Sequence, residues 1–94
     1  MSGQHENLEN RRKRLRYRAW HRGMREMDLL LGSFADAMLP DATGDRLNRF
    51  EVLIEAGDVE LLSWITGRAA PDEECDKDML SEISRFRAEG PDRG

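Results

Sequence analysis

Hydrophobic side chains recur at intervals of three and four residues along most of this 94-residue chain, which is typical of amphipathic helices. The clearest case is one long apolar stripe made of Met27, Leu30, Leu31, Phe34 and Met38. Gly32 and Asp36 lie mostly outside that stripe. No segment alternates with the period of two that strands require, and no hairpin signal occurs. The pattern therefore predicts an all-α fold.

Glycine, proline and capping residues divide the pattern into five predicted helices. They span residues 8–20, 24–39, 43–56, 59–66 and a last segment that runs from residue 72 to about residue 88. Gly57 and Gly67 are expected to end the third and fourth helices. Asp58 is expected to cap the fourth helix, and Asp72 to open the fifth. Because the connections are short, we predict a compact bundle of five short helices.

The length of the chain suits one domain with a modest core. We expect that domain to span residues 8–88, with flexible ends at residues 1–7 and 89–94. No apolar run is long enough to cross a membrane or to act as a secretory signal. The single cysteine, Cys75, excludes an internal disulfide and fits a reducing compartment. These features predict a cytoplasmic protein. We separately expect the chain to be a monomer when free.

The net charge of −4 hides a strong asymmetry. Residues 1–25 carry a balance of +6, whereas residues 26–94 carry −10. A basic helix on an acidic body indicates an anionic partner, nucleic acid, or the body itself as the counter-charge of the helix. A small nucleic-acid-associated protein that binds through the basic helix is therefore an alternative function. No helix-turn-helix, zinc or RNA-binding signature supports it, so we expect no nucleic-acid partner.

Catalytic constellations are scarce in this sequence. His5 and His21 have no metal-ligand spacing with each other or with Cys75. His21 is interpreted as a surface residue, and Cys75 as a small core residue on the inner stripe of the last helix. No glycine-rich phosphate loop follows a strand. We therefore predict a binding protein with no catalytic residue, no metal site and no stably bound cofactor.

The junction between the first two helices reads Arg22-Gly23-Met24-Arg25-Glu26. Gly23 can adopt a positive φ at little cost, so it can end one helix and orient the next. Residues beside such a junction are held in place and exposed, which suits recognition. A simpler interpretation is that Gly23 only ends the helix and that Arg22 and Glu26 form a surface pair. Physical reasoning alone favours the simpler interpretation.

The same five residues match the R-G-x-x-E motif of the SdhE-type assembly factors for the succinate dehydrogenase flavoprotein. The likeness continues through MDLLL and Phe34, as the second helix of that family does. It resumes at DVELLSWITG, which resembles the family segment D-x-D-[LI]-x-x-W-[ILM], with Glu60 in place of the usual aspartate. The sequence resembles this family over residues 15–86, which is most of the chain.

The resemblance implies a five-helix protein that is not an enzyme. Such a factor binds the flavoprotein subunit of succinate dehydrogenase and promotes covalent attachment of FAD to it, with the related fumarate reductase flavoprotein as a second client. The FAD acted on is that of the client. By residue-to-residue transfer, the predicted partner-binding surface consists of Arg22, Gly23, Met24, Arg25, Glu26, Asp58 and Trp64.

Overall fold

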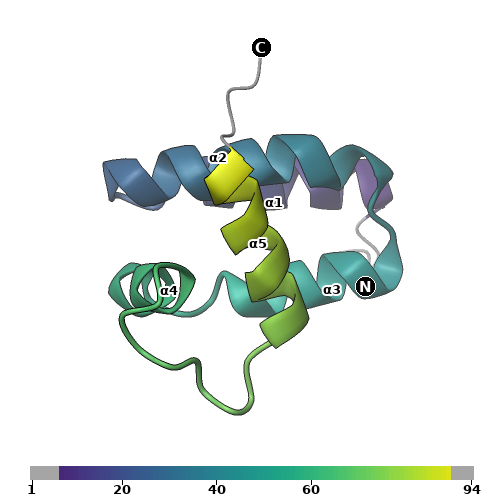
Figure 1. The fold of residues 1–94 in the computed structure, drawn as a ribbon. Helices are drawn as coiled ribbons and strands as arrows, with labels where there is room; N and C mark the ends of the chain where they lie inside the picture. The colour runs from purple at the N-terminus through teal and green to yellow at the C-terminus, as the bar shows by residue number, and fades with distance from the viewer. Residues whose placement is uncertain (1–6, 90–94) are drawn as a thin grey trace.

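Five α-helices make up the fold in the computed structural model, which describes residues 7–89 (Figure 1). They are α1 (Leu8–Trp20), α2 (Arg25–Met38), α3 (Gly44–Leu53), α4 (Asp58–Ile65) and α5 (Lys77–Glu89), with a 3-10 turn η2 (Leu39–Asp41) after α2. No strand occurs within these residues. The predicted all-α class with five helices is therefore confirmed.

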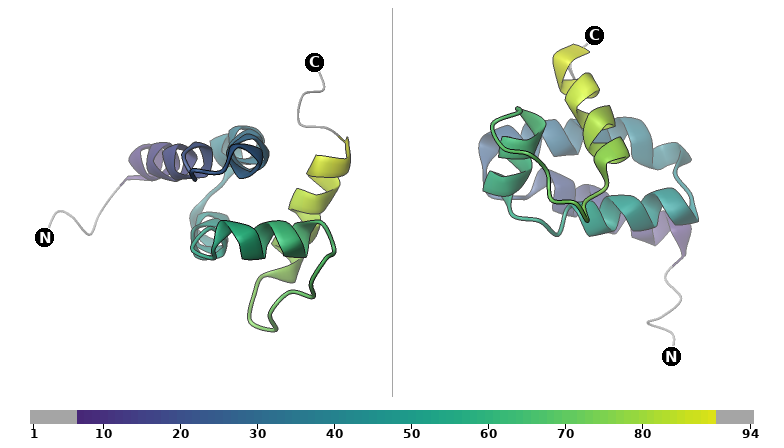
Figure 2. Two further views of the ribbon diagram at one scale, coloured as in Figure 1. Left: turned by 90° about the vertical axis from the view of Figure 1, so that its left-hand side faces the viewer. Right: turned by 60° about the horizontal axis from the view of Figure 1, so that its bottom comes forward.

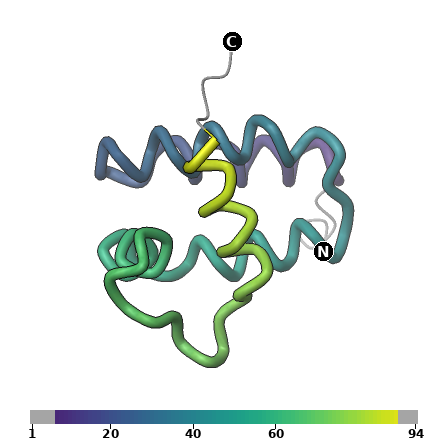
Figure 3. Tube along the Cα trace, viewed as in Figure 1, coloured from purple at the N-terminus to yellow at the C-terminus, as the bar shows by residue number. Residues whose placement is uncertain are grey.

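The first two helices form a hairpin, and the other three helices pack against it. Helices α1 and α2 run antiparallel, α3 lies along their length, and α5 crosses α2 and α3 (Figures 1 and 2). Helix α4 sits at the end of the molecule where α1 turns into α2, as the path of the chain in Figure 3 shows. The fold therefore brings the R-G-x-x-E segment close to α4.

One hydrophobic core holds these helices together. Helix α2 supplies much of it. The centroid of the Phe34 ring in that helix lies 6.1 Å from that of Phe50 and 5.6 Å from that of Phe86. Leu15 and Ala19 of α1 and Met79 of α5 are fully buried. Burial of these apolar surfaces is the main driving force for folding. The apolar stripes that the sequence pattern predicts are the faces that meet here.

Gly32 lies in this core, contrary to the expectation that it lies off the apolar stripe. The residue is buried, and a Cβ atom added to it would stand 2.1 Å from Cδ2 of Trp20. The Trp20 ring therefore lies directly on the backbone of α2, and its Nε1 donates a hydrogen bond to Asp36 at 3.2 Å. Only glycine leaves room for the indole at this crossing.

Helix α5 begins five residues later than predicted. Asp76, and not Asp72, precedes its first turn, and the Asp76 carboxylate accepts the backbone N–H of Met79 at 3.0 Å. Arg49 of α3 fixes that carboxylate through an Nε contact of 2.6 Å. Cys75 is therefore half-buried in the preceding turn and does not lie on the helix stripe.

The α3–α4 connection also differs from the prediction. Helix α3 ends at Leu53, and Gly57, with φ −66°, is the N-cap residue of α4 rather than a left-handed end to α3. Asp58 is the first residue of α4 and caps nothing, because its carboxylate is held by Arg22. Gly67 does follow α4 with φ +81°, as predicted.

Candidate functional site

The α1–α2 junction is a tightly hydrogen-bonded turn. Helix α1 ends at Trp20, and Gly23 adopts φ +97°, which only glycine takes up at low cost. The carboxylate of Asp28, in the first turns of α2, accepts the backbone N–H groups of Arg22 at 2.6 Å and of Gly23 at 3.2 Å. The direction of α2 relative to α1 is therefore fixed locally.

Arg22 ties this junction to the α3–α4 turn. Its Nε donates to Asp58 at 2.7 Å, and its Nη1 and Nη2 donate to the carbonyls of Ile54 at 2.6 Å and Ala56 at 2.9 Å. The side chain is only 10% exposed. A cation near the end of α3 is favourable, because the last carbonyls of a helix lack partners within it. The predicted surface pair of Arg22 with Glu26 does not form.

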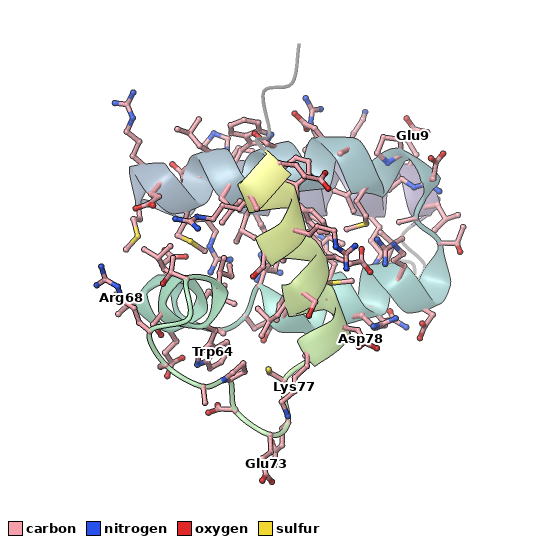
Figure 4. All side chains as sticks on the ribbon, in the orientation of Figure 1. Glu9, Trp64, Arg68, Glu73, Lys77 and Asp78 are labelled. Atoms are coloured by element: carbon pink, nitrogen blue, oxygen red, sulfur yellow. The ribbon has the colours of Figure 1, made fainter. Side chains whose placement is uncertain are left out.

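A hollow with a volume of about 570 Å³ opens beside the junction. Its walls come from the start of α2, the outer face of α4 and the end of α5, and we call it the Glu26 hollow. It is lined by Met24, Glu26, Val59, Leu62, Ser63, Thr66, Arg68 and Arg87. Arg68 lies beside α4, at the left of the molecule in Figure 4. The hollow combines an apolar wall with charges of both signs.

Among the described residues, the charged side chains that line this hollow have no partner, and neither has that of Arg25, which precedes Glu26. Within residues 7–89, no hydrogen bond or ion pair engages the side chains of Arg25, Glu26, Arg68 or Arg87. Val59 is 73% exposed, although it is apolar. Exposed apolar surface beside unpaired charges is typical of a site for a protein partner.

The basic residues of α1 are arranged differently. Glu51 of α3 accepts hydrogen bonds from Arg11 at 2.8 Å and Arg14 at 3.1 Å, and Arg18 approaches it to 3.8 Å. Arg11 and Arg14 lower the pKa of Glu51. The other two arginines of the helix also have partners. Arg16 pairs with Asp36 at 2.7 Å, and Arg12 donates a hydrogen bond to the Ala42 carbonyl at 2.6 Å. The acidic body is thus the counter-charge of the basic helix, as one of the three interpretations predicts.

Comparison with known families identifies the protein family of this chain. The family model described as Sdh5, the flavinator of succinate dehydrogenase, matches residues 13–87. The chain belongs to this family. The FAD assembly factor SdhE of Acetobacter pasteurianus is 41% identical over 88 residues, which are 90% of this chain and 81% of that protein.

Mitochondrial proteins are also similar to this member of the flavinator family. Succinate dehydrogenase assembly factor 2 of Dictyostelium discoideum is 33% identical over 84 residues, 89% of this chain and 60% of that protein. Its counterpart from Schizosaccharomyces pombe is 31% identical over 74 residues, 78% of this chain and 53% of that protein. The chain thus spans little more than half the length of these two relatives.

The seven residues predicted for the partner surface of this chain do not all lie together. Met24 and Glu26 line the Glu26 hollow, and Arg25 is exposed at the first position of α2. Asp58 is instead held by Arg22. Trp64 is half-buried, packs against the core and points toward the α4–α5 loop in Figure 4.

Several residues of the hollow are missing from the sequence prediction. Val59 and Leu62 lie on α4 and Thr66 directly follows it, and all three are less buried than Leu61 and Ile65 on the inner face of the helix. Their spacing of three and four residues could have shown a second, weaker stripe on this helix. Arg68 and Arg87 could not have been found this way, because they reach the hollow from separate elements.

No catalytic centre emerges among the residues that the structure describes. Residues 7–89 contain no group of three His, Cys, Asp or Glu side chains that could hold a metal ion. Burial raises the pKa of the Cys75 thiol, which disfavours the reactive thiolate. His21 is exposed, as predicted, and stacks on Tyr17 with 4.0 Å between ring centroids. His5 lies outside the described residues. Over the same range, no helix combines the length and hydrophobicity needed to cross a bilayer.

Proposed function

We propose that this chain is an assembly factor that binds the flavoprotein subunit of succinate dehydrogenase and promotes covalent attachment of FAD to it. Its membership of the flavinator family supports this function, as does its likeness to an FAD assembly factor over 90% of the chain. Proteins of this family are assembly factors and not catalytic enzymes. The covalent chemistry therefore belongs to the client subunit and its flavin.

The observation that carries the proposed site is the unpaired Glu26 carboxylate in a rigid setting. It stands in the first turn of α2 and lines the same hollow as the exposed apolar side chain of Val59, without an intramolecular partner among the described residues. The bonds of Arg22 and Asp28 fix the junction that precedes it. A preorganised charged group loses little entropy on binding, so it can contribute specificity to a protein interface.

Such a factor acts by differential binding. If it binds most tightly to the client conformation in which FAD faces its acceptor side chain, it raises the population of that conformation. FAD need not touch the factor for this effect. We therefore propose that FAD remains with the client and that this chain holds no cofactor of its own.

Three further details belong to the proposal. We propose that the chain acts in the cytoplasm, as its single cysteine and its similarity to a bacterial factor suggest. We also propose that it is monomeric when free and that the fumarate reductase flavoprotein is a second client. Nucleic-acid binding is disfavoured, because all five arginines of α1 have partners within the fold.

Covalent flavin in the client provides the test. The purified flavoprotein subunit of succinate dehydrogenase is incubated with FAD and the factor, denatured, and assayed for flavin fluorescence on a gel. We expect Glu26→Ala to lower affinity for the client by roughly tenfold and to slow flavin attachment. Glu73→Ala is the matched control, because Glu73 lies on the distant α4–α5 loop (Figure 4). Equal activity of the two variants would contradict the assignment of the site.

A further inference from the structure

The Glu26 hollow reaches well beyond the R-G-x-x-E segment. Val59 and Leu62 come from α4, Arg68 from the turn after it, and Arg87 from the last turns of α5. Arg68 and Arg87 bring two positive charges to the hollow that also holds the negative charge of Glu26. A charge pattern of this kind can read the chemistry of a bound segment and the direction in which it runs.

The opposite charges of this hollow do not neutralise one another. Neither guanidinium forms an ion pair with Glu26, so both lie more than 4.0 Å from its carboxylate. Elsewhere arginines do pair with carboxylates on neighbouring helices, as Arg11 of α1 does with Glu51 of α3 at 2.8 Å. The charges of the hollow are therefore left available for an external partner.

Apolar side chains lie in the same hollow as the charges. Met24 and Leu62 pack against the core and are only partly buried, and Val59 is exposed beside them. A side chain that covers this surface would bury apolar area and exclude water from the adjacent ion pairs, which strengthens them. The hollow thus offers an apolar contact together with sites for a cation and an anion.

We propose that the Glu26 hollow docks a segment of the client flavoprotein that carries a cationic side chain, an apolar side chain and a carboxylate. The cationic group pairs with Glu26, the apolar group covers Met24, Val59 and Leu62, and the carboxylate pairs with Arg68 and Arg87. Arginine suits the last role because its planar guanidinium can bind a carboxylate through two parallel hydrogen bonds. This inference rests on the proposed function, and the charge pattern sets the direction of the bound segment.

The test compares charge reversals at matched positions. Affinity of the full chain for the purified flavoprotein subunit of succinate dehydrogenase is measured for Arg68→Glu/Arg87→Glu and for Arg85→Glu. Arg85 is exposed on the same helix as Arg87 but lines a different hollow. We expect the double variant to bind roughly tenfold or more weakly, and Arg85→Glu to change affinity by less than about twofold.

Other outcomes separate this inference from the proposed function. If the double variant binds as well as Arg85→Glu while Glu26→Ala still weakens binding, the extension to α4 and α5 is wrong and the function stands. If the unaltered chain does not bind the flavoprotein, the proposed function is wrong. Should circular dichroism show that the charge reversals unfold the chain, Arg68→Gln/Arg87→Gln replaces them, and unchanged affinity of that folded variant likewise overturns the inference.

Discussion

Helix α1 and the Glu26 hollow handle charge in opposite ways. Helix α1 has the densest run of basic residues, yet all five of its arginines are paired with groups of the body, three of them at Glu51. The hollow has only a few charges, and those of Glu26, Arg68 and Arg87 have no partner within residues 7–89. The client site that we propose therefore coincides with the unpaired charges of the hollow and not with the densest run of charge in the sequence. The absence of internal pairing is the more useful sign.

The largest effect should come from Arg22, which belongs to the R-G-x-x-E segment but serves the fold. Arg22→Ala leaves the Asp58 carboxylate and two carbonyls without their donor, so we expect the free energy of unfolding to fall by about 2–4 kcal/mol. Urea denaturation measures this change. Arg25→Ala, at an exposed position without a partner, should change stability by less than about 0.5 kcal/mol. A fully stable Arg22→Ala chain that no longer binds the client would instead place Arg22 in the interface.

A second variant perturbs the α1 side and leaves the hollow intact. Gly32→Ala drives a methyl group into the Trp20 ring, so we expect a loss of roughly 1–3 kcal/mol in the free energy of unfolding. Gly44→Ala is the control, because a Cβ there meets nothing within 4 Å. Thermal unfolding compares the two. Affinity of the folded Gly32→Ala chain for the client should be unchanged, and a large loss would show that the two regions are coupled.

A smaller loss of stability should appear at acidic pH, from the carboxylates that pair with arginines inside the fold. Arginine partners lower the pKa values of Glu51, Asp76 and Glu82 in the folded chain. Their contribution to stability is complete above the unfolded carboxyl pKa of about 4 and is lost as pH falls through the lowered folded values. Denaturant titrations from pH 7 to pH 2 should show this fall. In Glu51→Gln the pH dependence should be shallower, and an unaltered slope would exclude Glu51 as a source of it.

Helix periodicity in the sequence predicts most of the fold, because each apolar stripe is a local pattern that meets the common core. The predicted helix boundaries are wrong where two positions carry similar local signals and a tertiary contact is formed at only one of them. Asp72 and Asp76 are both suitable residues to precede a helix. The helix starts after Asp76, whose carboxylate accepts the N–H of Met79 and pairs with Arg49 of α3. Gly32 also escapes prediction, since only the position of the Trp20 ring shows why a glycine is needed there.

The site is predicted only in part. The resemblance picks out Met24 and Glu26, which do lie together in the hollow. It cannot separate them from Arg22, because the partner of Arg22 stands 36 residues away at Asp58. The contribution of Arg87 is equally invisible, since it depends on how α5 crosses α2.

The Arg22 link has a consequence for local opening of the structure. It joins segments that are 32 to 36 residues apart, so the start of α4 cannot detach while the α1–α2 turn keeps its shape. The two should therefore open as one cooperative unit, with equal amide hydrogen-exchange protection at Asp28 and Leu61. A chain that has frayed at either end of this link would lose the walls of the hollow together. Recognition of the client would then also report that the factor itself is fully folded.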